Sequence, residues 1–205
     1  MPALTRERIL ETAAAMADRE GFEAVTLRRI AGELGVHVTS LYNHVPTRDA
    51  VTDGVVELLM EEAKLPAAPV DWEEWVRCFF AAMEALAVAH PGAFTALERR
   101  PVQGPRAAAS FEVALAAFAR AGFGPADAYS AVKATALTAL AVGLEQSLAA
   151  RGATAETAIG ELPPDRFPQL RSLGELTDPG PAWAFSLETL VAGLRAQLAL
   201  RGAGA

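Results

Sequence analysis

The stretch TLRRIAGELGVHVTSLYNHVP, residues 26 to 46, gathers arginines, histidines, a tyrosine and hydroxyl side chains in a chain whose net charge is −7. Between residues 24 and 48, Arg28, Arg29 and Arg48 stand against one acidic residue, Glu33. Residues 1 to 64 as a whole carry seven Lys or Arg against eleven Asp or Glu. Positive charge is therefore focused on one segment, which favours a local contact with nucleic acid over nonspecific coating.

Two short helices joined by a tight turn are expected to position these side chains. Thr26 can cap the first helix, and Gly35 suits the left-handed residue that ends it. A second helix is predicted over about residues 38 to 44, before Pro46. This pair has the pattern of a helix-turn-helix, whose second helix lies in the major groove. With Leu41 in the core, helical spacing turns outward His37, Thr39, Ser40, Asn43 and His44.

The remaining sequence also predicts helices, so we expect an all-α fold. One helix precedes the pair and ends at Gly21, and a fourth follows the cap Thr47 to about residue 63. The proline-rich segment at residues 65 to 71 divides the chain into a DNA-binding domain, residues 1–64, with helix four as connector, and a helical ligand-binding and dimerisation domain, residues 65–205. The helices expected there span residues 72–89, 91–99, 105–121, 125–151 and 182–201, with a short piece at 165–176.

The stretch TLRRIAGELGVHVTSLYNHVPTRDAV resembles the amino-terminal domain of the tetracycline-repressor (TetR) family of bacterial transcriptional regulators, over residues 5 to 63. The likeness lies in the Ala and Gly spacing, the segment LYNHV and the charged start of the fourth helix. The resemblance implies phosphate contacts from Thr26, Tyr42, His44 and Arg48. It implies base contacts from Arg28, His37, Thr39, Ser40 and Asn43, with Val38 against a thymine methyl.

The segments at residues 126–150 and 182–201 are apolar on nearly all sides, which one intramolecular face does not explain. Two such helices from each of two chains would form a four-helix interface, as in the resembling family. We expect this interface to contain Leu137, Leu140, Leu144, Leu148, Leu187, Leu190, Val191, Leu194 and Leu198. A homodimer implies a palindromic operator read by two helices about 34 to 36 Å apart.

Large apolar side chains concentrate between residues 72 and 118. Core packing explains them by default, and aromatic walls with few polar groups are also typical of small-molecule pockets. The side chains expected to line such a pocket are Trp75, Phe79, Met83, Leu86, Phe94, Phe111, Leu115, Phe118, Tyr129 and Thr135. The hypothesis is a repressor that a small apolar or amphipathic effector releases from double-stranded operator DNA.

No metal or cofactor is predicted. The tetracycline repressor holds a magnesium-chelated drug with histidine, asparagine and acidic side chains, whereas His90 is the one histidine of this chain outside the DNA-binding segment. We expect His90, beside Pro91, to be structural, and tetracycline itself to be a poor candidate ligand.

The overall composition limits the cellular compartment and the class of function that we expect. A single cysteine, Cys78, fits a reducing cytoplasm, and no apolar run reaches the roughly 18 to 20 residues that cross a bilayer. An enzyme is disfavoured because no nucleophile stands beside a base and no Gly-rich phosphate loop occurs. The alternative left open is a ligand-independent DNA-binding or interaction protein, which would have a filled core.

Overall fold

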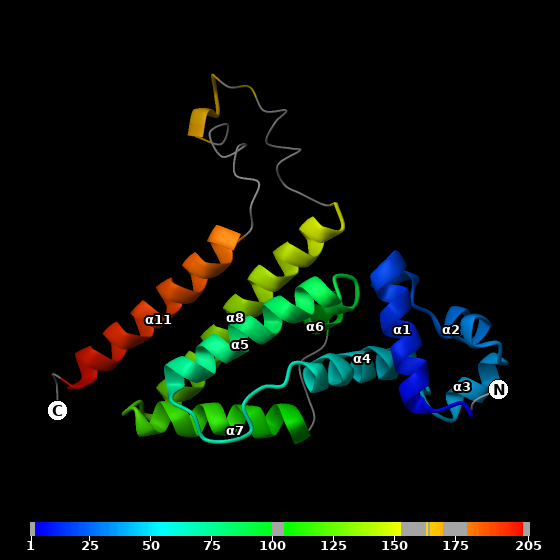
Figure 1. Ribbon diagram of the computed structural model, residues 1–205, viewed down its shortest axis with the longest axis horizontal. Coiled ribbons are helices and arrows are strands. Elements are labelled where there is room, and N and C mark those ends of the chain that lie inside the picture. Colours follow the sequence, from blue (N-terminus) through cyan, green and yellow to red (C-terminus); the bar gives the residue numbers. More distant parts are fainter. Residues whose placement is uncertain (1–2, 100–104, 153–162, 164, 170–179, 203–205) are drawn as a thin grey trace.

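The computed structural model describes residues 3–99, 105–152, 163, 165–169 and 180–202, and helices are the regular elements of these ranges (Figure 1). The predicted all-α class is confirmed. In chain order the elements are α1 (Arg6–Glu20), the 3-10 helix η1 (Phe22–Ala24), α2 (Leu27–Leu34), α3 (Val38–Tyr42), α4 (Arg48–Glu62), α5 (Trp72–Ala89), the 3-10 helix η2 (Ala93–Thr95), α6 (Ala96–Arg99), α7 (Pro105–Arg120), α8 (Pro125–Ala150) and α11 (Gly180–Gly202).

Side-chain caps fix where four of the helices begin. The hydroxyls of Thr5, Thr26 and Thr47 accept hydrogen bonds from backbone N–H groups in the first turns of α1, α2 and α4. The carboxylate of Asp71 does the same for α5, at 2.8 Å. Each cap satisfies an amide that the first helical turn leaves unpaired. The caps predicted at Thr26 and Thr47 are therefore confirmed.

Gly35 closes the turn between α2 and α3. Its φ of 67° and ψ of 31° lie in the left-handed region, which glycine adopts without the penalty that a Cβ brings. The N–H of Val36 donates to the carbonyl of Ala31 at 3.0 Å and completes the turn. Ile30 and Leu41, from the two helices, are both fully buried in one core. The predicted helix-turn-helix is confirmed.

Helix α3 is two residues shorter than predicted. It ends at Tyr42, after which the N–H groups of His44 and Val45 both donate to the carbonyl of Leu41. Pro46 cannot resume the helix, because it has no backbone N–H to donate.

Helix α4 joins the amino-terminal unit, which consists of α1, η1, α2 and α3, to the rest of the chain. Gly54 lets α4 approach α1 closely, since a Cβ at this position would lie 2.4 Å from the side chain of Leu10. The same helix also contacts α6 and α7. The buried side chains form one continuous cluster from α1 to α11. The division at residues 64 and 65 falls in the connection between α4 and α5, and two separate domains remain a prediction.

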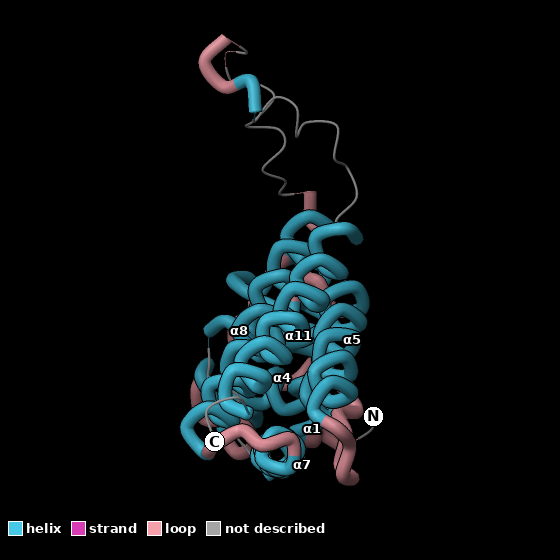
Figure 2. The backbone as a smooth tube through the Cα atoms, turned by 90° about the vertical axis from the view of Figure 1, so that its left-hand side faces the viewer, coloured by secondary structure: helices cyan, strands magenta, loops and turns pink. Residues whose placement is uncertain are grey.

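The carboxy-terminal body consists of α5, η2, α6, α7, α8 and α11, and it is built around α5. This helix packs against α7, α8 and α11, and Figures 1 and 2 show α5, α8 and α11 running alongside one another. Aromatic pairs join the layers: the ring centroids lie 5.6 Å apart for Trp72 and Phe118, and 5.5 Å apart for Phe80 and Trp183. Such contacts add to the stabilisation from burial alone.

The segment predicted as one helix over residues 91–99 is instead the 3-10 helix η2 followed by the short α6. Gly92 packs so closely on α1 that a Cβ there would lie 1.9 Å from the carbonyl oxygen of Ala17. This tight approach bends the chain at the point where a continuous helix was expected. The short piece predicted at residues 165–176 lies largely outside the described residues.

Candidate functional site

Helix α3 presents a polar face that two apolar residues hold in place. Leu41, predicted to lie in the core, and Val45, just after the helix, are completely buried and fix the rotation of the helix. Of the predicted DNA contacts in this segment, those whose side chains are exposed are His37, Thr39, Tyr42 and Asn43. The half-buried ones are Val38, Ser40 and His44. The structure thus brings all seven predicted residues together on one short segment.

His37 stands at the start of α3 and caps it. Its Nδ1 accepts the backbone N–H of Thr39 at 3.4 Å and lies 2.8 Å from the Thr39 hydroxyl. Because Nδ1 serves as an acceptor from the backbone, Nε2 is the ring nitrogen left for an external partner. The same residue therefore shapes the helix and offers a donor beside it.

The two arginines of α2 differ in what they bind. Arg29 donates to Glu20 at 2.6 Å and to the carbonyl of Ala24 at 3.4 Å, so its charge ties α2 to the end of α1. Arg28 is exposed and makes no ion pair with any residue that the structure describes. Thr26, also predicted to contact phosphate, is exposed at the start of α2. Arg28 is thus the cation of α2 that is free to meet an anion.

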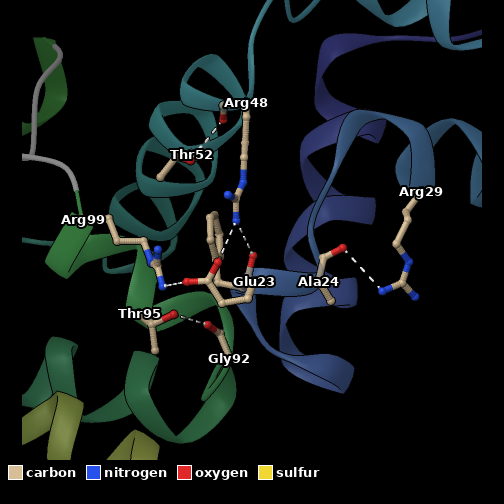
Figure 3. A network of polar contacts seen from close by, with 9 residues as sticks. Glu23, Ala24, Arg29, Arg48, Thr52, Gly92, Thr95 and Arg99 are labelled. Atoms are coloured by element: carbon tan, nitrogen blue, oxygen red, sulfur yellow. Dashed lines mark hydrogen bonds and ion pairs between the residues drawn. The ribbon is translucent and has the colours of Figure 1, made fainter.

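Arg48, at the start of α4, belongs to a polar network centred on Glu23 (Figure 3). Its guanidinium donates to the Glu23 carboxylate at 3.2 Å and to the carbonyl of Phe22 at 3.3 Å. The other carboxylate oxygen of Glu23 accepts a hydrogen bond from Arg99 of α6. Glu23 therefore joins a predicted phosphate-binding arginine to the carboxy-terminal body.

Charge and packing reinforce this network. Hydrogen bonds from Arg99 and then from Arg48 hold the pKa of Glu23 below its ordinary value. The guanidinium carbon of Arg99 also lies 5.8 Å from the centre of the Phe22 ring, within cation–π range. Sequence reasoning missed Glu23 and Arg99, because 76 residues separate them along the chain and no local pattern pairs them.

The helix-turn-helix and its neighbours coincide with a known family. Residues 9–53, which run from α1 into α4 and include the whole α2–α3 pair, match the family model described as bacterial regulatory proteins, tetR family. The amino-terminal part of the chain is thus similar to the TetR family. The resemblance read from the sequence is confirmed.

Curated relatives of this chain align over different lengths. An HTH-type transcriptional regulator of Saccharopolyspora erythraea is 37% identical over 63% of this chain and 56% of its own length. The class D tetracycline repressor of Escherichia coli is 28% identical over 97% of this chain and 92% of its own. This chain spans only about half the length of several curated relatives that it matches.

Solved structures cover nearly the whole chain. The Streptomyces coelicolor TetR-family protein ActR, solved in complex with actinorhodin, superposes with a TM-score of 0.79 at 27% identity, over 96% of this chain and 99% of ActR. Apo ActR gives a TM-score of 0.78 at 28% identity, over 98% and 99% of the two chains. The similarity therefore includes the carboxy-terminal body as well as the amino-terminal unit.

The side chains predicted to line a pocket lie mostly within the core of the carboxy-terminal body. The buried ones are Trp75, Phe79, Met83, Leu86, Phe94, Phe118 and Thr135, and the half-buried ones are Phe111 and Leu115. Thr135 donates its hydroxyl to the carbonyl of Ala131 at 2.9 Å. Tyr129 is not brought to this cluster, since it is 57% exposed and lies 6.0 Å from the ammonium of Lys133.

A cavity of about 270 Å³ opens between the end of α4, the connection to α5, and α7. The residues that form most of its wall are Met60, Lys64, Leu65, Pro66, Ala109 and Ser110. None of the residues predicted to line a pocket contributes to this described wall. Sequence reasoning missed the cavity because its two sides lie more than forty residues apart and the wall has no aromatic signature.

The predicted dimer residues lie on two neighbouring helices, α8 and α11, with α11 outermost in Figure 1. Leu137 and Leu148 are exposed, at 62% and 40%. The half-buried members are Leu140, Leu144, Leu187, Leu190 and Leu198. Val191 and Leu194 are buried within the protomer itself and face its own core. Phe185 and Leu200, which were not predicted, add exposed apolar surface on α11.

Two further classes of site do not occur among the described residues. None of their helices is long and apolar enough to span a membrane. No group of three or more His, Cys, Asp or Glu side chains in the same ranges is arranged to hold a metal ion.

Proposed function

We propose that this chain is a ligand-responsive transcriptional repressor that binds a palindromic operator as a homodimer and leaves it when a small apolar or amphipathic molecule binds. The observation that carries the proposal is the polar face of α3, held outward by the buried Leu41 and Val45. Its exposed hydrogen-bonding groups and the free Arg28 supply what base edges and phosphates require. The proposed reader residues are those named for DNA contact in the sequence.

One similar protein supports regulation by a ligand, and another supports repression. ActR of Streptomyces coelicolor was solved with actinorhodin and with (S)-DNPA, and one relative from Streptomyces coeruleorubidus is named a transcriptional repressor. Within this chain, α4 begins at Arg48 beside the amino-terminal unit and ends at the wall of the cavity. A displacement of α4 at the cavity would therefore also move its other end, at Arg48. A coupling of about 1–3 kcal/mol weakens operator binding some 5- to 150-fold.

The dimer is proposed to form through α8 and α11. Leu137 on α8 and Phe185 on α11, the latter 74% exposed, are large apolar side chains that water would otherwise surround. A twofold dimer places two α3 helices on one side of the duplex, about one turn apart. Such a regulator works beside the bacterial chromosome, in the cytoplasm, and carries out no catalytic step.

Selection of DNA fragments by the purified protein tests the proposal. We expect a palindromic site to be enriched, and a gel shift on that site to show a complex of two protomers. Small molecules that the proteins encoded by neighbouring genes make or transport should abolish the shift at micromolar to millimolar concentration. Enrichment of no site would refute DNA reading, whereas a site that no ligand releases would favour the ligand-independent alternative.

A further inference from the structure

The cavity beside the end of α4 contains a buried polar group with nothing to bind. Ser110, on α7, is only 6% exposed, and its hydroxyl has no hydrogen-bond partner among the described residues. A buried hydroxyl without a partner lowers stability, so such groups are usually satisfied. Since Ser110 lines the cavity, an acceptor bound there would satisfy it.

A cation stands on the opposite wall of the same cavity. Lys64 follows the end of α4, is exposed, and makes no ion pair with a described residue. Its backbone is left-handed, with a φ of 48°, the only described non-glycine residue with a positive φ. Glu61, the acidic residue of the lining, already has an interaction partner. The ammonium of Lys64 is therefore the charge that remains available to a ligand.

The rest of the wall is apolar. Met60, Leu65 and Pro66 come from the end of α4 and the segment after it, and Ala109 comes from α7. An apolar wall with a few convergent polar groups is typical of sites for amphipathic small molecules. The Glu61 carboxylate of the lining already has a partner, the Lys64 ammonium can only donate, and the Ser110 hydroxyl can donate as well as accept. An acceptor on the ligand would therefore satisfy both Lys64 and Ser110.

We infer that this cavity binds an amphipathic molecule through an oxyanion head group, such as a carboxylate, phenolate or sulfonate, which accepts hydrogen bonds from Lys64 and Ser110. The apolar part of the molecule packs against Met60 and Leu65. This inference rests on the proposed function and specifies the chemical class of its effector. It also names the point of action, since the head group is held directly at the carboxyl end of α4.

Two fluorescent probes of matched shape test the head group. The probe 1-anilinonaphthalene-8-sulfonate carries an anionic sulfonate, and N-phenyl-1-naphthylamine has the same aromatic body without it. We expect the wild-type protein to bind the sulfonate at least about 10-fold more tightly than the neutral amine. Lys64→Met should weaken sulfonate binding about 10-fold and leave binding of the amine unchanged, while Lys64→Arg should retain most of the affinity.

Matched variants distinguish binding at this cavity from a general effect of the protein's charge on binding of the sulfonate. Ser110→Ala should weaken sulfonate binding several-fold, and Lys133→Met, which removes a cation from α8, should not change it. Circular dichroism verifies that each variant is folded. The inference is overturned if both probes bind equally, if Lys64→Met and Lys133→Met act alike, or if the sulfonate does not bind at all.

The operator provides an independent readout. Release of the operator by the sulfonate in the wild type, and its loss in Lys64→Met, would support both the inference and the proposed function. Lys64-dependent binding without any change in operator affinity would sustain the head-group assignment and contradict the proposed release mechanism. Operator release by a compound whose action is indifferent to Lys64 and Ser110 would leave the proposed function intact and overturn this inference.

Discussion

The imidazole of His90 lies against the carboxylate of Asp18, with 2.9 Å between Nδ1 and Oδ2, although 72 residues separate them. The other ring nitrogen lies 3.0 Å from Glu62 at the end of α4. The second oxygen of Asp18 accepts the backbone N–H groups of Gly92 and Ala93. The amino-terminal unit, the connector α4 and the carboxy-terminal body therefore meet at His90, which was expected to be structural.

His90 gives the stability of this junction a dependence on pH. Burial disfavours the charged imidazole, but hydrogen bonds to Asp18 and Glu62 outweigh it and raise the pKa of His90 above its ordinary value. A raised folded-state pKa stabilises the fold fully below the unfolded pKa, about 6.5, and this contribution is lost as pH rises through the folded pKa. We expect His90→Gln to lower the free energy of unfolding more at pH 6 than at pH 8.5, by on the order of 1 kcal/mol.

Urea denaturation at fixed protein concentration across this pH range measures the difference. Glu62→Gln serves as the matched variant, because it removes one of the two carboxylates and should reduce the same pH dependence in part. A constant difference between His90→Gln and wild type from pH 6 to 8.5 would show that the imidazole does not act through its charge.

Substitution by alanine is expected to change the stability of the fold in opposite directions at Gly92 and Gly32. Gly92→Ala places a Cβ against the backbone carbonyl of Ala17, which cannot move without shifting α1, so we expect a loss of about 2 kcal/mol or more. Gly32→Ala, exposed within α2 with nothing near its Cβ, should raise stability by about 0.5–1 kcal/mol. Urea midpoints compare the two, and equal effects would argue against close packing of η2 on α1.

Arg28→Ala should weaken operator binding by about 1–3 kcal/mol while leaving the fold and the dimer intact. The reason is that Arg28 is exposed with no ion pair among the described residues, so its charge serves an external partner. Arg29→Ala is the control, since Arg29 is held by Glu20 and should affect stability more than affinity. Fluorescence anisotropy on the selected operator, with thermal unfolding alongside, distinguishes the two, and a larger affinity loss for Arg29→Ala would reverse the assignment.

Leu137→Glu should convert the dimer to monomer at micromolar concentration. Leu137 is 62% exposed on α8, and a carboxylate there would be buried without a partner in a dimer built on α8 and α11. Val88→Glu, at a 60% exposed position on α5, is the control and should leave the dimer unchanged. Sedimentation velocity reports the oligomeric state, and a dimeric Leu137→Glu protein would require a different interface.

The sequence anticipated the features that depend on neighbours along the chain. Thr26 and Thr47 were recognised as caps because a hydroxyl reaches the backbone only two or three residues ahead. Gly35 and Pro46 marked the ends of helices through their own backbone restrictions. The position of Leu41 identified the core face of α3 and, through helical spacing, its polar face.

Local pattern also failed in specific places. It predicted one helix over residues 91–99, where contact of Gly92 with α1 imposes η2 and α6. It did not anticipate the described cavity beside Lys64 and Ser110, and the aromatic pocket, whose predicted side chains are mostly buried, remains a prediction. Both differences come from the close approach of elements that the sequence does not place next to each other.

What the sequence determined by itself was thus the identity and order of the helices and the chemistry of the reading face, since hydrogen bonds and side-chain spacing within about four residues decide these. Only the tertiary structure decided how that face is connected to the rest of the chain. The contacts of Glu23 with Arg48 and Arg99, and of His90 with Asp18, join residues 25 to 76 positions apart. Such pairs depend on how whole helices pack, which no local periodicity encodes.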